Sequence, residues 1–322
     1  MKGKYTVTIE NRRVRYEFTI RRNITIIRGD SATGKTQLLE MLSAYGRQNG
    51  DSGVTLHCER PCMVLDAVLW EQSIRSVSQS IFFVDEGNAF VTSEAFAKAV
   101  LASDNYFVII TRDALPNLPY SVEEIYGIRT SSKYAGLKQT YNELYHLYGN
   151  VTAAGLPTAK KAVIEDTNAG FEFFNAVLHE RMQCVSAGGK SAIPHVLRNA
   201  PPGDVMLVIA DGAAFGSEME RMERLMNAGR EIALYLPESF EWIILSAQLT
   251  DDAEIKDILE HPEDFVESME YSSWEQFFTA LLVRKTDGTY LRYSKRNLNP
   301  AYLQEKERTA ILDATHVLKC MQ

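Results

Sequence analysis

Eight residues near the start of the chain have the types and spacing of a phosphate-binding loop. The segment GDSATGKT, Gly29 to Thr36, matches the pattern GxxxxGK[ST] and stands between an apolar stretch and a segment with helical periodicity. Glycines let the backbone approach a phosphate closely, and N–H groups at a helix N-terminus attract negative charge. Lys35 is therefore expected to contact the β- and γ-phosphates of ATP, and Thr36 to bind Mg²⁺. The full expected nucleotide-binding set is Gly29, Asp30, Ser31, Ala32, Thr33, Gly34, Lys35, Thr36 and Gln37.

Two acidic residues end a second apolar segment, SIFFVDE. Asp85 is expected to hold the Mg²⁺ of the nucleotide and Glu86 to polarise the attacking water, a pair that favours hydrolysis over binding alone. The next strand-like segment ends in TRD and brings Arg112 to the same edge of the sheet. Arg112 is a candidate catalytic residue that senses the γ-phosphate. Pairing with a surface acid, Asp113 or Glu123, is the equal alternative.

Charged residues also follow the strand-like segments of the second half of the chain. If these strands are parallel, their carboxyl ends meet at one edge of the sheet. Carboxylates from separate strands then converge on a divalent cation, as in sites that cut or rejoin phosphodiester bonds. Glu165 and Asp211 are the candidate ligands of this second metal site. Other charged residues at these ends are Asp166, Lys190, Glu238 and Glu241.

The first 130 residues must supply the elements that position the nucleotide site. Alternating or apolar segments predict strands at 5–10, 13–20, 23–29, 53–58, 80–86 and 106–112. Helices are predicted after Gly34 and at 93–103. Strands separated by helices predict a parallel sheet covered on both faces. From 131 the pattern loses clear strands, and the small and polar residues near 150–160 predict a domain boundary.

Four strand–helix units follow in about ninety residues, the size of a small doubly wound domain. The predicted strands are 161–166, 184–189, 204–211 and 231–237, and the predicted helices are 170–182, 190–200, 217–229 and 239–249. Residues 251–322 combine an acidic helical region with a hairpin at 280–295, turned at Asp287 and Gly288. The fold class is therefore α/β, and the expected domains are 1–150, 160–250 and a C-terminal extension, 251–322.

The first part of the chain, about 5–130, resembles the P-loop ATPases of the ABC and AAA-like groups. This resemblance implies an ATPase with a Walker A segment at Gly29–Thr36 and a Walker B segment ending in Asp85. The chain departs from ABC proteins because WEQSIRSVSQ stands where an LSGGQ-type signature is expected. An ABC-style sandwich dimer is therefore not implied.

The order of motifs in 160–247 is similar to that of a TOPRIM domain, and most of all to OLD-family (overcoming lysogenization defect) nucleases, which place such a domain after an ATPase. Glu165 matches the first glutamate of that family, and Asp211 matches the first acid of its DxD motif. The second acid is replaced by Ala213. Its loss removes a metal ligand and a negative charge, unless Asp166 or Glu218 compensates.

Bulk properties limit the classes of function. The chain has 322 residues, 45% of them hydrophobic, and a net charge of −8, which is unlike a protein that coats nucleic acid with its whole surface. Residues 1–30 hold eight Lys or Arg against three acids and could form a local basic groove. The four cysteines lack paired CxxC spacing and are expected to be reduced. Without a leader or a spanning segment, a cytoplasmic location is expected, with no membrane partner.

Two functions follow as expectations. The first is an ATP-dependent enzyme that uses ATP and Mg²⁺, with the second domain acting in nucleic-acid metabolism or defence, on DNA or RNA. The alternative is a nucleotide-switched protein-binding module whose TOPRIM-like domain is inactive. A homo-oligomer or another protein is the candidate partner in that case.

Overall fold

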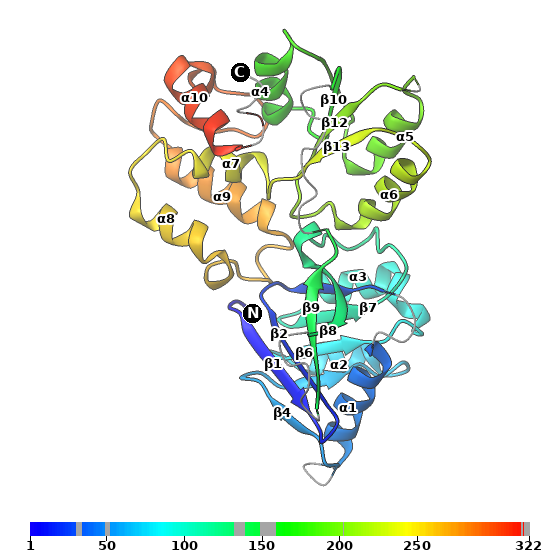
Figure 1. Cartoon of the computed structure of the whole chain (residues 1–322). Helices are drawn as coiled ribbons and strands as arrows, with labels where there is room; N and C mark the ends of the chain where they lie inside the picture. Colours follow the sequence, from blue (N-terminus) through cyan, green and yellow to red (C-terminus); the bar gives the residue numbers. More distant parts are fainter. Residues whose placement is uncertain are drawn as a thin grey trace. The chain divides into compact units, whose positions relative to one another are not determined.

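The computed structural model of the chain describes residues 1–29, 34–48, 52–131, 139–148, 159–201, 203–316 and 318. They form two compact units (Figure 1). Unit 1 comprises Met1–Gly149 and His261–Ser272, and unit 2 comprises Asn150–Glu260 and Ser273–Gln322. The predicted boundary at 150–160 falls almost entirely outside the described residues. The segment 251–322, predicted as a separate extension, is divided between the two units.

Unit 1 is built on one nine-stranded sheet. Its strands are β1 Tyr5–Glu10, β2 Val14–Ile20, β3 Ile24–Ile27, β4 Thr55–His57, β5 Cys62–Val64, β6 Ile81–Val84, β7 Tyr106–Ile110, β8 Ile125–Thr130 and β9 Thr140–His146. Across the sheet they lie in the order β4-β1-β2-β9-β8-β3-β7-β6-β5. The helices of the unit are α1 Lys35–Gln48, α2 Trp70–Ser76 and α3 Glu94–Leu101, with short 3-10 turns η1 Ala89–Thr92, η2 Val122–Glu124 and η7 Pro262–Asp264.

The sheet is mixed rather than wholly parallel. Strands β5, β6, β7, β3 and β8 run parallel, and of these β3, β6 and β7 were predicted. The hairpin of β1 and β2 is antiparallel, because the Asn11 side chain accepts from the N–H groups of Arg13 (2.8 Å) and Val14 (3.0 Å) and closes a tight turn. Strands β5, β8 and β9 were not predicted. Strand β9 is only half-buried, so its apolar alternation is weak, and its pairing with β2 and β8 defines it.

Both faces of the central strands are covered. All residues of β3, β6 and β7 are buried, which explains their nearly continuous apolar sequences. On one face Leu38 and Leu42 of α1 belong to the same core as β1 and β2. On the other face Phe96 of α3 packs edge-on against Phe107, whose ring stacks on Phe82 at 5.7 Å.

The nine-stranded sheet must curl strongly, because its two edge strands are consecutive in the chain. At about 4.8 Å per strand, a flat sheet would separate β4 from β5 by about 38 Å. The connection from His57 to Cys62 spans at most about 18 Å. The edges therefore approach each other, and α1 contacts both of them.

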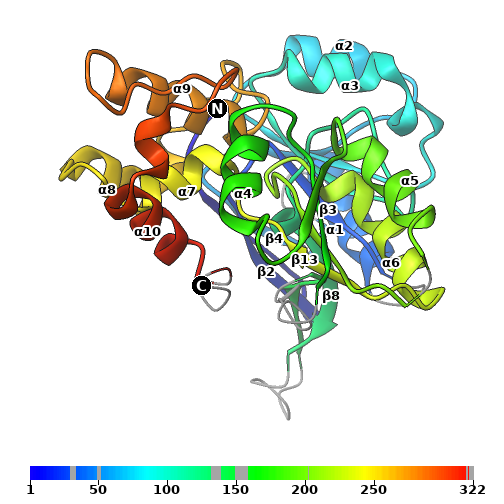
Figure 2. The same ribbon diagram turned by 90° about the horizontal axis from the view of Figure 1, so that it is seen from above.

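Unit 2 contains a four-stranded parallel sheet in the order β11-β10-β12-β13. The strands are β10 Lys161–Ile164, β11 Gln183–Ser186, β12 Met206–Ile209 and β13 Ile232–Tyr235. The helices between and after them are α4 Ala169–Leu178, α5 Ile193–Arg198, α6 Met219–Asn227 and α7 Phe240–Ser246, with 3-10 turns η5 Lys190–Ala192 and η6 Gly216–Glu218. All four predicted strand–helix units are confirmed. Figure 2 shows α5 and α6 beside each other in this unit.

The C-terminal part of unit 2 is helical. It contains α8 Ala253–Glu260, α9 Trp274–Thr286, α10 Glu305–Ala314 and a 3-10 turn η8 Pro300–Leu303. Among the helices of the described segments, none is long and apolar enough to cross a membrane.

The predicted hairpin at 280–295 is wrong. Its first half is the end of α9, where the buried residues Trp274, Phe277, Phe278, Leu281 and Leu282 recur with helical period. The predicted hairpin began at residue 280, inside this helical pattern. The few apolar residues that remained after 280 therefore resembled a short strand. After the turn at Gly288, the N–H of Tyr293 bonds to the Thr286 hydroxyl (2.9 Å), so the chain folds over the helix end without forming a strand.

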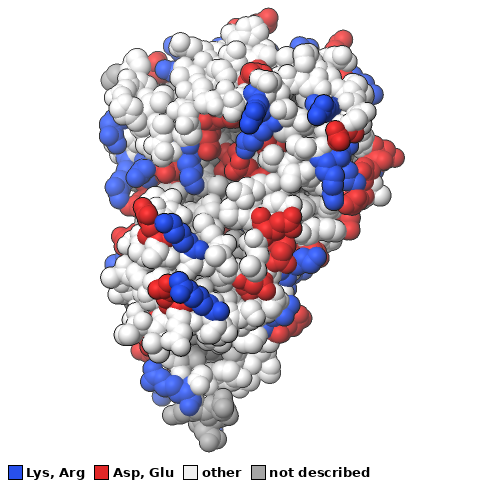
Figure 3. Space-filling model, turned by 180° about the vertical axis from the view of Figure 1, so that it is seen from behind, with Lys and Arg blue, Asp and Glu red and all other residues white. Residues whose placement is uncertain are grey.

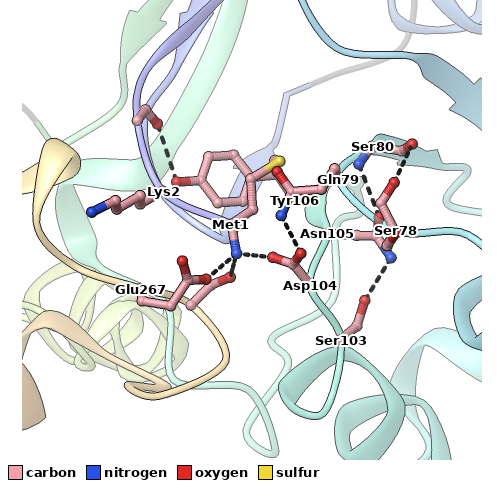
Figure 4. Close-up of polar contacts among 12 residues, drawn as sticks. Met1, Lys2, Ser78, Gln79, Ser80, Ser103, Asp104, Asn105, Tyr106 and Glu267 are labelled. Carbon is pink, nitrogen blue, oxygen red and sulfur yellow. Dashed lines mark hydrogen bonds and ion pairs between the residues drawn. The ribbon is translucent and has the colours of Figure 1, made fainter.

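The segment 261–272 is attached to the start of unit 1 (Figure 4). The buried amino group of Met1 forms ion pairs with Asp104 and Glu267 and a hydrogen bond to the Ser268 hydroxyl (2.8 Å). The backbone N–H of Ser268 in turn donates to the carbonyl of Met1 (3.2 Å). These contacts explain why a segment far along the sequence belongs to the first unit.

Candidate functional site

The loop at Gly29–Thr36 connects the buried strand β3 to the first turn of α1. Gly29 and Gly34 have φ values of 136° and 92°, which L side chains rarely adopt. A Cβ atom on Gly34 would also lie 2.7 Å from the Tyr16 hydroxyl, so both glycines are required by geometry. The residues between them, Asp30, Ser31, Ala32 and Thr33, lie outside the described part of the chain.

The Lys35 side chain turns back toward the end of β3. It is only 6% exposed, its Nζ donates to the carbonyl oxygen of Gly29 at 2.5 Å, and it lies 3.5 Å from Oε2 of Glu86. A buried ammonium group needs partners of opposite charge or polarity. Lys35 therefore connects the start of α1 to the acidic residues that follow β6.

Strand β7 lies between β3 and β6, so the residues after β7 stand between the loop and Asp85–Glu86. The Nε atom of Arg112 lies 3.5 Å from Oε2 of Glu86, the carboxylate oxygen that Lys35 also approaches. Glu86 is a partner that neither sequence alternative for Arg112 included. Its buried neighbour Thr111 accepts a hydrogen bond from the N–H of Asp113 at 3.0 Å, which holds the turn after β7.

A cavity of about 300 Å³ lies along α1 and reaches Thr36 at one end. Its lining includes Asp85 and Val64, from the ends of β6 and β5. Thr36 and Gln37 are exposed, and Gln37 Oε1 accepts from the Tyr16 hydroxyl at 3.3 Å. Mg²⁺ takes one or two protein oxygens and completes its shell with water and phosphate oxygens. A threonine hydroxyl and a carboxylate on one cavity fit that requirement.

In unit 2 the parallel sheet brings Glu165 and Asp211 together, as predicted. Glu165 follows β10 and Asp211 follows β12, its neighbour in the sheet. The Oε2 atom of Glu165 accepts the backbone N–H of Asp211 at 3.1 Å. Lys190, after β11, lies nearby but directs its Nζ to the carbonyl of Ala214 at 2.6 Å.

Gly212 explains the small residues after β12. A Cβ atom there would lie 2.4 Å from the Leu236 carbonyl oxygen and 2.8 Å from that of Pro237. The N–H of Gly212 donates to the Pro237 carbonyl at 2.6 Å. Only glycine allows the turn after β12 to pack this closely on the turn after β13.

A small cavity of about 20 Å³ lies at these strand ends, large enough for one water molecule. Its polar lining consists of Glu165, Asp166, Asp211, Glu241 and Lys295. Lys295 donates to Glu275 at 2.5 Å, and the Tyr293 hydroxyl donates to Glu241 at 2.8 Å. We name Glu165, Asp211, Glu241, Glu275 and Lys295 the carboxylate cluster.

Sequence reasoning missed Glu275, Tyr293 and Lys295. They lie beyond the four strand–helix units, in a segment that has no motif. Lys295 is brought to the sheet by a backbone contact, in which its carbonyl accepts from the N–H of Ala169 at 3.3 Å. No local sequence signal encodes such a long-range contact.

The electrostatics of the carboxylate cluster reflect crowding of acids. Burial raises the pKa of Asp211 well above its ordinary value, and the charges of Glu275, Glu241 and Glu165 raise it further. Burial also raises the pKa of Glu165. For Lys295, burial lowers the pKa, but the carboxylates of Glu241 and Glu275 outweigh it and raise the pKa above the ordinary lysine value. The ammonium group therefore stays charged and partly neutralises the acids.

In unit 2 the position that corresponds to the second acid of the family motif offers no side-chain oxygen to a cation. Ala213, in the place of the second family acid, is 2% exposed, and its N–H donates to the Glu238 carbonyl at 3.2 Å. Within the described ranges, no three His, Cys, Asp or Glu side chains are grouped so that they could hold a metal ion. Lys295 already supplies a cation at the cavity.

The two proposed substitutes for the missing acid, Asp166 and Glu218, both take part in local contacts. The carboxylate of Asp166 accepts backbone N–H groups at the start of α4, from Thr167 (2.7 Å), Asn168 (3.1 Å) and Gly170 (2.9 Å). Glu218 is 2% exposed and forms an ion pair with Arg221 at 2.9 Å. Both side chains are occupied in local structure.

Several basic side chains of the block at 1–30 form ion pairs with acids. Arg15 contacts Glu10 and Glu17 at 3.3 and 2.5 Å, and Arg21 and Arg22 both contact the buried Glu124 at 3.1 and 3.4 Å. Figure 3 shows positive and negative side chains intermixed over the face that it draws. The block therefore offers less free positive charge to a nucleic acid than its composition indicates.

Comparison with known proteins adds no relative. No protein-family model matches the chain, and a search of curated proteins gives no match. The functional assignment therefore depends on the residues and their geometry.

Proposed function

We propose that unit 1 binds ATP with Mg²⁺ and hydrolyses it. The observation that carries the proposal is the convergence of Lys35 and Arg112 on one oxygen of Glu86, at the carboxyl ends of adjacent parallel strands. Ligands bind outside the carboxyl ends of strands in open α/β sheets. Lys35 and Arg112 supply two cationic groups that can interact with the phosphates of a nucleotide, while Asp85 and Glu86 supply the acids of the same site.

Each residue has a role that follows from its position. Lys35 would move its ammonium group from Glu86 to the β- and γ-phosphates, and Arg112 would neutralise charge that develops on the γ-phosphate. Thr36 and Asp85 would hold Mg²⁺, which when bound neutralises the phosphate oxygens. Once its two cationic partners contact the nucleotide, Glu86 becomes free to orient the attacking water.

Turnover of ATP in purified variants tests this proposal. Lys35→Ala and Glu86→Gln should each lower the rate of phosphate release by at least about 100-fold. The Glu86→Gln variant should still bind ATP, because its cationic groups remain. Lys98→Ala and Glu94→Gln are matched controls, since these exposed residues of α3 pair with each other at 3.9 Å, away from the site. Wild-type rates in the Lys35 and Glu86 variants would refute the proposal.

For unit 2 we propose a nucleotide-switched protein-binding module rather than a nuclease. The buried Ala213 and the ammonium group of Lys295 support this choice, because metal-dependent cleavage needs several oxygen ligands around an accessible cation. Fusion to an ATPase then makes the nucleotide state of unit 1 the signal. A role in nucleic-acid metabolism or defence remains a proposal that follows from the TOPRIM resemblance.

Cleavage assays separate the two functions. The full chain, incubated with plasmid or single-stranded DNA, ATP and Mg²⁺ or Mn²⁺, should leave both substrates intact. Cleavage that disappears in both Glu165→Gln and Asp211→Asn would instead establish a nuclease. Cleavage that persists in both variants would indicate a contaminant, which a second purification step would remove.

A further inference from the structure

A tyrosine hydroxyl lies on the otherwise apolar buried face of β2. That face consists of Val14, Tyr16, Phe18 and Ile20, which belong to the core that α1 covers. The Tyr16 side chain is 1% exposed. A buried hydroxyl group costs free energy unless it is hydrogen-bonded. Since phenylalanine would pack in the same space without that cost, the partner of the hydroxyl indicates its role.

The partner is the last glycine of the Gly29–Thr36 loop. The Tyr16 hydroxyl donates to the carbonyl oxygen of Gly34 at 2.9 Å, and Gln37 Oε1 is a second acceptor at 3.3 Å. The same carbonyl accepts the N–H of Leu38 at 3.0 Å, within the first turn of α1. Burial raises the pKa of Tyr16 above the ordinary tyrosine value, so the hydroxyl keeps its proton and remains a donor. Two donors therefore hold the Gly34 carbonyl.

Gly34 and Tyr16 also fit each other in shape. Gly34 has a φ of 92°, and the Tyr16 hydroxyl occupies the space that a side chain there would fill, 2.7 Å from the Cβ position. Asn142, the register partner of Tyr16 in β9, places its amide nitrogen 3.6 Å from the same position. Thr130 in β8 donates to Oδ1 of Asn142 at 3.1 Å. The contact with Gly34 thus belongs to a row of polar side chains on three neighbouring strands.

The direction of the Gly34 carbonyl fixes the direction of a backbone donor. This carbonyl and the N–H of Lys35 belong to one planar trans peptide, so they point in opposite directions. Lys35 begins α1, and the N–H groups in the first turn of a helix have no partner within the helix. Such groups bind phosphate at a helix N-terminus. A glycine peptide rotates easily, whereas the two donors to its carbonyl hold it in one orientation.

We infer that Tyr16 is a positioning residue of the nucleotide site, whose hydroxyl holds the Gly34 carbonyl so that the N–H groups at the start of α1 face the phosphates. The inference rests on the proposed binding of ATP by unit 1, and it adds a residue from outside the Gly29–Thr36 segment. In this role Tyr16 contacts the loop rather than the reacting atoms. Its loss should weaken binding of the ground state and of the transition state equally, which raises KM and leaves kcat unchanged.

Tyr16→Phe tests the inference, because it removes the hydroxyl and keeps the ring in the core. Isothermal titration calorimetry of the full chain, with a non-hydrolysable ATP analogue and Mg²⁺, measures binding without turnover. We expect the Kd to rise about 3–10-fold, the effect of one lost hydrogen bond. In steady-state assays with ATP, KM should rise by a similar factor, and kcat should stay within about twofold.

Tyr106→Phe is the matched control. Tyr106 is 2% exposed, lies in the same sheet, and donates its hydroxyl to the carbonyl of Gly3 at 3.1 Å. It stands at the start of β7, near Met1 (Figure 4), whereas the Gly29–Thr36 loop follows the other end of the parallel strand β3. The control should lose thermal stability about as Tyr16→Phe does, but its Kd and KM should stay within about twofold of the unmodified chain.

Three results would overturn the inference while ATP turnover by the unmodified chain still supports the proposed function. The Tyr16 variant could keep the Kd of the unmodified chain, or both tyrosine variants could weaken binding equally. The Tyr16 variant could also lower kcat with KM unchanged, which is the result of a smaller folded fraction. If the unmodified chain binds no nucleotide in calorimetry, the proposed function and this inference are both wrong.

Discussion

In unit 1 two cations, Lys35 and Arg112, surround one carboxylate, Glu86, beside a cavity of about 300 Å³. In unit 2 a cluster rich in carboxylates surrounds a space of about 20 Å³ and contains the ammonium group of Lys295. Both sets of side chains lie at the carboxyl ends of parallel strands. We infer from this difference that the carboxyl ends of parallel strands can bind a ligand only under two conditions. Charged side chains there must be able to leave their protein partners, and the cavity must be large enough for the ligand.

Measurement of metal binding is the strongest test of this difference between the two units. With a non-hydrolysable ATP analogue, Asp85→Asn should weaken Mn²⁺ binding by at least about 10-fold, because one of two protein ligands is lost. Glu165→Gln should change it by less than twofold, because we propose that the carboxylate cluster does not use a metal. Free Mn²⁺ measured by electron paramagnetic resonance gives both values. The reverse order of effects would contradict the contrast between the two units.

Gly212→Ala tests the close packing beneath the carboxylate cluster. The new Cβ would overlap two carbonyl oxygens that cannot move independently, so we expect a loss of about 2–3 kcal/mol in the free energy of unfolding of unit 2. Urea unfolding followed by the fluorescence of Trp242 and Trp274 measures it. As a control, Gly46→Ala in α1 meets no atom within 4 Å and should stabilise unit 1 by about 0.5–1 kcal/mol. Equal effects in the two variants would refute the packing argument.

Lys295→Met tests the internal cation. Its removal leaves Glu241, Glu275 and Asp211 without a compensating charge, but the Lys295 side chain is 41% exposed and solvent screens part of the loss. We expect a cost of about 1–2 kcal/mol in the same urea experiment. Lys256→Met is the control, because Lys256 pairs with the exposed Asp251 and should cost less than about 0.5 kcal/mol. A Lys295 variant as stable as the control would show that the cluster does not need its ammonium group.

Asp211→Asn should have the smallest effect, and its sign depends on pH. Because the folded state raises the pKa of Asp211, the stabilising contribution of its protonated form is complete below the unfolded pKa and is lost as pH rises through the folded pKa. The Asn variant should therefore be slightly more stable than the unmodified chain at pH 7.5, by less than the loss in Lys295→Met. The difference should shrink as pH falls toward 4. A destabilised variant at pH 7.5 would mean that the ionised carboxylate is favoured by the fold.

Local patterns were sufficient for the elements around both sites. The strands β3, β6 and β7 were predicted because central parallel strands are continuously apolar. The four strand–helix units of unit 2 were predicted because short apolar segments alternate there with segments of helical periodicity, with turn residues between them. The prediction failed at β5, β8, β9 and the supposed hairpin. Strand β9 owes its existence to partners from distant segments, and Leu281 and Leu282 continue a helix that starts at Trp274.

The sequence by itself determined the glycine-rich loop with Lys35, the acids after β6 and the placement of Glu165 and Asp211 at the ends of strands, because these features depend on local spacing and strand direction. Only the tertiary structure decided that Arg112 contacts Glu86 and that Lys295 enters the carboxylate cluster. The physical reason is that the net charge and the free volume of a site are sums over all segments that reach it. No short stretch of sequence contains those sums.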